Sequence, residues 1–438
     1  MSIQHPASSD LSTAVSKFFR RVVPLLIIML VCNQLNRANI GYAREYLEAD
    51  VGIGAAAYGF GAGVFFIAYA IFELPSNIMM ERFGARIWLT RIMVSWGVIS
   101  AAMMFVKNAE MFYVLRFLLG VAEAGFFPAV IYYMAKWLPN SHRGRATALF
   151  IAGSSLAAAL SGPLSGPLLS MHGLAGLRGW QWLFLVEGAT SVTVGVIGFF
   201  ILNSHIRDAK WLSRNEQDAL MAAIDAEEHE KAAASGVEGK GSRWRMMADP
   251  KLILFCWIYF AIQLSIYANT FWLPSIVRRI HGLNDITVGL LSSLPWICAV
   301  AAMYLSSRMG DRDPARRRPL LIVALITAAV GTYLAAIASP WLALVFLCIA
   351  AMGFKSASPL FWSIPQSTLH PMVLAPAIAI INSLGNLGGF VAPFGFGLIK
   401  QATGQVTWGL YALAAASAIA AASVLLVRKS QPAILTTV

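Results

Sequence analysis

Twelve long apolar segments constrain this 438-residue chain more than any other feature of its sequence. A run of about 20 apolar residues is long enough to cross the hydrocarbon core of a bilayer as a helix. Only 12% of the residues are charged, whereas soluble proteins carry about 25%. The sequence therefore predicts an all-α integral membrane protein with twelve transmembrane helices. They are expected at residues 22–43, 57–80, 86–106, 109–134, 144–170, 180–202, 251–274, 285–308, 318–338, 341–362, 371–399 and 405–427.

The longest charged stretch divides the apolar runs into two groups of six. We expect it to form a helical, solvated connector. Most Lys and Arg residues in the loops fall on the side that this stretch shares with both termini, and the positive-inside rule places that side in the cytoplasm. The predicted parts are a cytoplasmic tail, a six-helix bundle, the connector, a second six-helix bundle and a cytoplasmic tail, at residues 1–21, 22–202, 203–250, 251–427 and 428–438.

The net charge of +12 could indicate a nucleic-acid partner, but the basic residues cluster in short loops between apolar runs. The sequence has no zinc-finger, homeodomain or P-loop pattern. Its four cysteines lie inside apolar runs without metal-ligand spacing, and no Ser-His-Asp or metal-hydrolase motif is present. We therefore expect no nucleic-acid partner, no metal, no cofactor and no catalytic residues. A membrane-embedded enzyme stays as an alternative that would need such a motif.

An acid followed by arginine recurs in equivalent loops of the two groups, and the fifth and eleventh runs are both rich in Gly and Pro. Two related halves of six helices imply a binding site near the midplane, where the halves meet. We expect the acid-arginine loops to act as a gating latch on the cytoplasmic side. The latch residues are Glu81, Arg82, Arg86, Asp311 and Arg312.

Three cations lie inside predicted spans: Arg37, Arg116 and Lys355. A charge at the bilayer centre costs roughly 2.5–3.5 kcal/mol, so each must be paired, line a watery cavity or snorkel to the interface. Glu123 lies seven residues after Arg116, about two helical turns, and so shares its face. We expect Arg37 and Arg116 to attract a substrate anion and Glu123 to take up and release a proton. Pairing with other helices is the alternative for Arg116 and Glu123.

Lys355 has three possible roles. It could hold a second carboxylate of the substrate, pair with Glu123, or extend to the interface. Two further acids, Glu73 and Glu187, lie inside or at the edges of spans, and we expect them to close ion pairs with loop arginines.

Four segments resemble the anion:cation symporter branch of the major facilitator superfamily. They are Phe72–Arg86, Arg116–Pro128, Trp180–Gly188 and Ile381–Gly389. The resemblance extends from about residue 17 to 429 and is nearest to bacterial tartrate, phthalate and hydroxyphenylacetate permeases. It implies a proton-coupled importer of organic anions in the inner membrane, with monomer as the default state of this fold.

The resemblance also implies a set of site residues. In sugar-acid members of this branch, the binding and coupling site includes an Asp-Arg pair in the first helix, a Tyr in the second, and an Arg with a Glu in the fourth. Positions in the fifth, tenth and eleventh helices complete it. The matching residues here are Asn36, Arg37, Tyr69, Arg116, Glu123, Ser154, Trp362 and Asn382.

This chain departs from the family at Asn36, where an Asp is usual. An amide cannot carry a proton, so one of two expected protonation sites is missing and Glu123 is left as the main proton carrier. One negative charge fewer, together with Lys355, favours a doubly charged substrate such as phthalate or tartrate. The alternative within the same class is a proton-coupled exporter or antiporter of anions.

Overall fold

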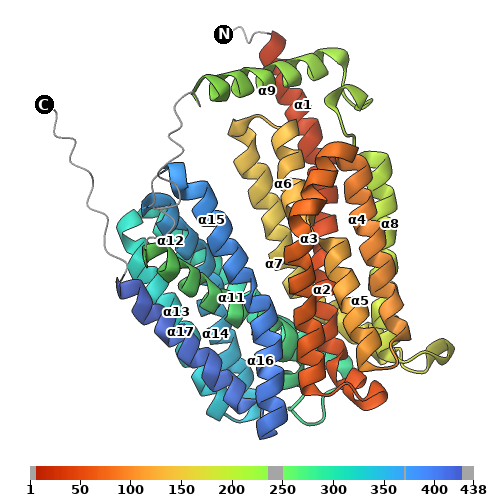
Figure 1. Ribbon diagram of the computed structural model, residues 1–438, viewed down its shortest axis with the longest axis vertical. Helices are drawn as coiled ribbons and strands as arrows, with labels where there is room; N and C mark the ends of the chain where they lie inside the picture. The colour runs from red at the N-terminus through yellow and green to blue at the C-terminus, as the bar shows by residue number, and fades with distance from the viewer. Residues whose placement is uncertain (1–5, 235–249, 369–370, 427–438) are drawn as a thin grey trace, which may run out of the picture. The chain divides into compact units, whose positions relative to one another are not determined.

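The computed structural model describes residues 6–234, 250–368 and 371–426, and every regular element in these ranges is a helix (Figure 1). The predicted all-α character is thus confirmed for this part of the chain. In the first half the helices are α1 (Pro6–Arg21), α2 (Val23–Val51), α3 (Ala55–Phe83), α4 (Ala85–Ala102), α5 (Ala109–Glu123), α6 (Phe126–Trp137), α7 (Asn140–Ser170), α8 (Gly179–Ile201) and α9 (Arg214–Ala234). In the second half they are α11 (Pro250–Val277), α12 (Asp285–Arg312), α13 (Arg317–Ile337), α14 (Pro340–Thr368), α15 (Pro371–Asn386), α16 (Gly388–Thr403) and α17 (Thr407–Leu426).

The described residues gather into two compact units. The first unit holds those between Met1 and Ile53, between Val64 and Gly239, and between Asn284 and Leu290. The second holds those between Gly54 and Gly63, between Lys240 and Leu283, and between Leu291 and Val438. The predicted limits of the two bundles, 22–202 and 251–427, remain a prediction.

Within the described ranges, ten helical segments are long and apolar enough to cross a membrane. They are Ala55–Phe83, Ala85–Phe105, Ala109–Trp137, Asn140–Ser170, Gly179–Ile201, Lys251–Val277, Asp285–Arg312, Arg317–Ile337, Pro340–Pro365 and Thr407–Leu426. The other two predicted spans correspond to α2 and to the pair α15 and α16. Helix α2 has 29 residues but carries amide and charged side chains along its second half. The pair is interrupted at Leu387, so each part has only 16 residues.

Small residues let the helices approach closely within each unit. A Cβ atom added to Gly188 of α8 would lie 2.5 Å from the backbone nitrogen of Ala101 in α4. In the second unit, a Cβ atom on Gly331 of α13 would lie 2.6 Å from the backbone nitrogen of Ala350 in α14. Helices in a membrane gain stability from such close backbone packing. The glycines thus fix two of the tightest helix pairs.

The fourth predicted span, at 109–134, corresponds to the membrane-crossing segment Ala109–Trp137, but its helix is interrupted. Helix α5 ends at Glu123 and α6 begins at Phe126. Gly125 lies between them with φ of 84°, and a Cβ atom there would lie 2.6 Å from Ser76 Oγ. Only glycine adopts this backbone conformation without strain, and only glycine leaves room for Ser76. The break places Glu123 at a helix end.

Helices α1 and α9 lie side by side at one end of the first unit (Figure 1). Lys17 of α1 donates to both carboxylate oxygens of Glu216 in α9, at 2.7 and 2.8 Å. Arg143 of α7 pairs with Glu227 of α9 at 3.2 Å. The connector is therefore helical over Arg214–Ala234, as predicted, and is fixed to the first unit by ion pairs at two points. We call this end of the unit the α9 end.

Candidate functional site

An ion pair between α2 and α5 forms the centre of the candidate site. The Arg37 guanidinium donates from Nε to Glu123 Oε1, and its Nη2 atom contacts the same oxygen. The Glu123 side chain is fully buried, whereas 17% of the Arg37 side chain is exposed. The second carboxylate oxygen, Oε2, is buried without a hydrogen-bond partner among the described residues. A carboxylate held by one accessible arginine can lose that partner when another anion arrives.

Aromatic rings of α3 surround the guanidinium groups. The Cζ atom of Arg37 lies 5.0 Å from the ring centre of Tyr69 and 5.2 Å from that of Phe65. The Cζ atom of Arg116 lies 4.9 Å from the same Phe65 ring, and Arg116 is only 1% exposed. Arginines at such distances from aromatic rings gain cation–π stabilisation. The structure therefore brings together four predicted site residues of the first unit: Arg37, Tyr69, Arg116 and Glu123.

Asn36 occupies a different environment from its neighbour Arg37. Its Nδ2 atom donates to the Cys32 carbonyl at 2.8 Å and to Ser191 Oγ of α8 at 2.9 Å, and its Oδ1 atom accepts from Ser100 of α4. The side chain is 1% exposed. Asn36 is thus a fully used donor and acceptor between α2, α4 and α8, apart from the rings around Arg37.

Glu187 lies in this second polar cluster, and the expectation that it pairs with a loop arginine was wrong. Its Oε2 atom accepts a hydrogen bond of 2.9 Å from Asn39 Nδ2. Among the described residues, none of the ion pairs involves Glu187. The prediction failed because α8 turns this residue toward α2 and α7. The spacing of Asn33, Asn36 and Asn39 was the sequence signal for a polar face on α2, although it did not identify the partner.

Glu73 also differs from expectation, since no ion pair of 4 Å or less links it to an arginine in the described chain. Its backbone carbonyl accepts from Asn77 at 2.8 Å. Ser154, predicted to bind substrate, donates to the carbonyl of Ile151 within its own helix at 2.8 Å.

The three remaining predicted binding residues belong to the second unit. The Nζ atom of Lys355 lies 5.5 Å from the ring centre of Trp296. The ring of Trp362 packs against Tyr259, with centres 4.7 Å apart. Asn382 is half-buried in α15. The contact that stabilises Lys355 here is with the aromatic face of Trp296 rather than with an acid.

The predicted latch residues lie at helix ends. Arg86 donates from Nε to the Phe199 carbonyl at 2.7 Å and stacks over that ring at 4.1 Å. Arg82 lies 5.8 Å from the Phe83 ring centre. Asp311 is 3.8 Å from Arg317, and Arg312 is exposed at the end of α12. The contacts made by Arg86 therefore fasten α4 to α8 within the first unit.

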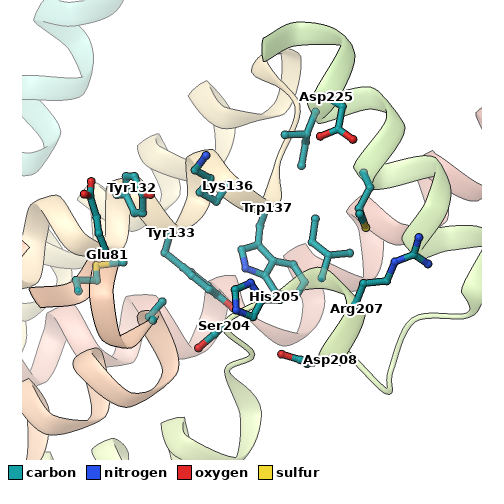
Figure 2. A pocket seen from close by; sticks show the side chains of 16 residues that line it. Glu81, Tyr132, Tyr133, Lys136, Trp137, Ser204, His205, Arg207, Asp208 and Asp225 are labelled. Atoms are coloured by element: carbon teal, nitrogen blue, oxygen red, sulfur yellow. The ribbon is translucent and has the colours of Figure 1, made fainter. Parts of the chain in front are cut away.

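Glu81 lines a cavity of about 630 Å³ at the α9 end. Figure 2 shows its mixed lining: Lys136 and Trp137 come from α6, and Arg207 and Asp208 come from the segment after α8. Charges of both signs and several aromatic rings surround this cavity. It lies apart from the ion pair of Arg37 and Glu123, whose residues are not in its lining.

Comparison with known proteins gives a family and a fold. The sequence model of the Major Facilitator Superfamily matches residues 26–393. A protein of Agrobacterium vitis named "Putative tartrate transporter" is 40% identical over 426 residues, covering 97% of this chain and 94% of that protein. The quinolone resistance transporter of Acinetobacter baumannii is 39% identical, covering 90% of each chain.

Among solved structures, the xylose transporter XylE of E. coli matches with a TM-score of 0.73 at 14% identity, covering 94% of this chain and 98% of that one. At 14% sequence identity, this structural match supports a shared fold and nothing more specific. Together with the helical architecture, it confirms the predicted fold class.

Proposed function

Since this chain belongs to the major facilitator superfamily and so is a membrane transporter rather than an enzyme, we propose that it takes up a small organic anion together with protons. The observation that carries the proposal is the buried ion pair of Arg37 and Glu123, with Arg116 beside it on the same aromatic ring. This group contains two cations and one acid, and protonation of the acid leaves two positive charges for a substrate. We further propose that the transporter resides in the bacterial inner membrane as a monomer with both termini in the cytoplasm.

Proton coupling follows from competition for Arg37. A substrate carboxylate can form two parallel hydrogen bonds with a guanidinium, which is stronger than the single-oxygen contact that Glu123 makes. When the substrate binds Arg37, the fully buried Glu123 loses its cation. An unpaired buried carboxylate is costly, so Glu123 takes up a proton. Substrate and proton therefore bind together, as symport requires.

The substrate class follows from the number of cations. Arg37 and Arg116 lie on the same unit, and both approach the Phe65 ring. A dicarboxylate or hydroxy acid offers enough oxygens for both guanidinium groups. The relative of Agrobacterium vitis supports this class, since its name refers to tartrate.

Uptake into proteoliposomes tests the proposal. With an inward proton gradient, we expect accumulation of labelled tartrate or phthalate above 4-hydroxyphenylacetate. Glu123→Gln should abolish gradient-driven accumulation and retain exchange against preloaded substrate. Glu110→Gln is the matched control, because Glu110 lies in the exposed first turn of the same helix. Uptake of monocarboxylates alone, or accumulation that survives Glu123→Gln, would contradict the proposal.

Export is the second candidate function, and the 39% identity to a quinolone resistance transporter is the observation that favours it. The same vesicles distinguish the two directions. An exporter would exchange protons for the anion, so a gradient directed opposite to that of symport would drive accumulation.

A further inference from the structure

We propose that Glu187 is a second proton-binding residue of the transport cycle, and that it holds its proton while Arg37 pairs with Glu123. The part concerning transport rests on the proposed function, whereas the protonated state does not. No proton site was predicted at this position, which was expected to form an ion pair.

The first observation is burial without a cation. Glu187 is 6% exposed in α8 and receives one hydrogen bond, from the neutral amide of Asn39. Its Oε1 atom is buried without a hydrogen-bond partner in the described chain. A carboxylate needs strong donors or a cation to stay ionised away from water. Glu187 has neither, which favours the neutral acid.

Among the described elements packed against α8, no charged side chain forms an ion pair or hydrogen bond with the Glu187 carboxyl; the acid that α2 brings to α8, Asp50, accepts from Trp180 instead. From α2, the titratable groups facing Glu187 are Cys32 and Tyr42, both neutral at pH 7 in water. Helix α4 contributes Ser100, and the short helix at Met103–Phe105 contributes only apolar side chains. The nearest basic residue of α4, Arg91, lies more than two turns from Ser100 and stacks on Trp88 at 4.5 Å.

From α7, Ser165 contacts the Glu187 carboxyl. Ser165 is 1% exposed, and its Oγ atom has no partner under strict hydrogen-bond geometry. A protonated Oε1 atom has an O–H group that can donate to Ser165 Oγ. The Ser165 hydroxyl can equally donate to an ionised Oε1 atom, so this contact is satisfied in either state, and Oε2 keeps its bond from Asn39. The neutral acid is favoured because Glu187 is buried without a cation.

Helix α2 connects this acid to the binding site. Asn36 and Asn39 are three residues apart and face α8, whereas Arg37 is turned by about 100° toward α3 and α5. Glu187 also accepts at its backbone carbonyl from Ser191 at 3.0 Å, and Ser191 accepts from Asn36 at 2.9 Å. Two acids thus flank α2, and movement of this helix affects both. Glu187 takes this proton from outside water before the substrate binds and gives it to cytoplasmic water after the substrate leaves. The empty carrier returns with Glu187 ionised, so one proton is carried and no other reactant is needed.

Infrared spectroscopy of the purified protein in lipid tests the protonated state. We expect a carboxylic-acid C=O band at neutral pH that Glu187→Gln removes and Glu110→Gln retains. Glutamine has the shape of a protonated glutamate, so this variant should fold with an unchanged melting temperature. Ser165→Ala keeps the acid and should shift the band upward, because the O–H donor loses its acceptor. An unchanged carboxylic-acid region in Glu187→Gln would overturn the proposal.

The proton-to-substrate ratio in proteoliposomes tests the transport part. We expect Glu187→Gln to lower the ratio by one proton relative to the parent, with substrate exchange retained. An unchanged ratio would overturn the role in transport. A parent protein that shows no proton-driven uptake would refute the proposed function instead, while the infrared result would still decide the state of Glu187.

Discussion

Arg37 and Asn36 are adjacent in sequence but have different partners, and this separation determines their chemistry. Arg37 is partly accessible and contacts an acid and two rings, whereas Asn36 is buried and bonded on all sides. An Asn in place of the Asp that the family resemblance implies at position 36 therefore changes a buried hydrogen-bond network rather than the proposed substrate-binding Arg37. Asn36 also donates to the backbone carbonyl of Glu187 at 3.5 Å.

Arg37→Lys tests the requirement for a guanidinium. A lysine keeps the charge but cannot form two parallel hydrogen bonds with a carboxylate. Loss of one charge-assisted bond, about 1.5–3 kcal/mol, should raise the KM for a dicarboxylate roughly 10- to 100-fold. The control is Arg178→Lys, because Arg178 pairs with Asp50 and its side chain is 46% exposed. An unchanged KM in Arg37→Lys would mean that Arg37 serves only to neutralise Glu123.

At the scale of helices, the break between α5 and α6 positions Glu123, the proposed proton carrier. Gly125→Ala should lower the free energy of unfolding by about 1–3 kcal/mol, since alanine is strained at φ of 84° and its Cβ would meet Ser76. Gly144→Ala is the control. Gly144 lies inside α7 with open space around it, and alanine there should stabilise by up to about 1 kcal/mol. Thermal unfolding in detergent measures both, and equal effects would argue against a strained break.

The contact of α1 with α9 predicts a pH dependence. Burial acts to raise the pKa of Glu216. Hydrogen bonds from Lys17 and from the backbone of Ser213, together with the positive charge of Lys17, lower it. The lowering effects are larger, so the pKa of Glu216 lies below its ordinary value. Glu216 also forms a reciprocal cap with Ser213 at the start of α9. Because the pKa of Glu216 is lower in the folded state, its contribution to the free energy of unfolding is complete above the unfolded pKa of about 4.3. This contribution is lost as the pH falls through the folded-state pKa.

Glu216→Gln should therefore melt at a lower temperature than the parent near pH 7, and the difference should shrink below about pH 4. Asp225→Asn, on an exposed position of the same helix, should melt like the parent at both pH values. Melting curves between these pH values measure the difference. A difference in melting temperature between Glu216→Gln and the parent that grows as the pH falls would contradict a lowered pKa of Glu216.

The places of the membrane-crossing segments could be predicted from the sequence, because apolar runs of this length leave little choice. Two features could not. The break at Gly125 lies inside an unbroken apolar run, and the need for glycine there comes from the backbone conformation and from contact with Ser76 of another helix. Likewise, the partner of Glu187 depends on how α8 rotates against α2, which composition does not specify. The pairing of Arg37 with Glu123, 86 residues apart, has the same origin.

For the whole molecule, the two proposed proton sites, Glu123 and Glu187, would determine the net charge that moves in each cycle. A dianion carried with one proton on Glu123 and one on Glu187 moves no net charge, so its accumulation should not depend on membrane potential. Glu187→Gln would carry one proton and one net negative charge. At a potential of about 100 mV, negative inside, each charge is worth about 2.3 kcal/mol, which lowers the accumulation ratio roughly 40-fold.

Uptake of tartrate with and without a valinomycin-imposed potassium potential measures this effect. The parent and Glu110→Gln should accumulate equally under both conditions, whereas Glu187→Gln should respond to the potential. A parent that already responds with the sign of one negative charge would show that a single proton accompanies the dianion. Glu123 would then be sufficient for coupling, because one carboxyl can bind only one proton.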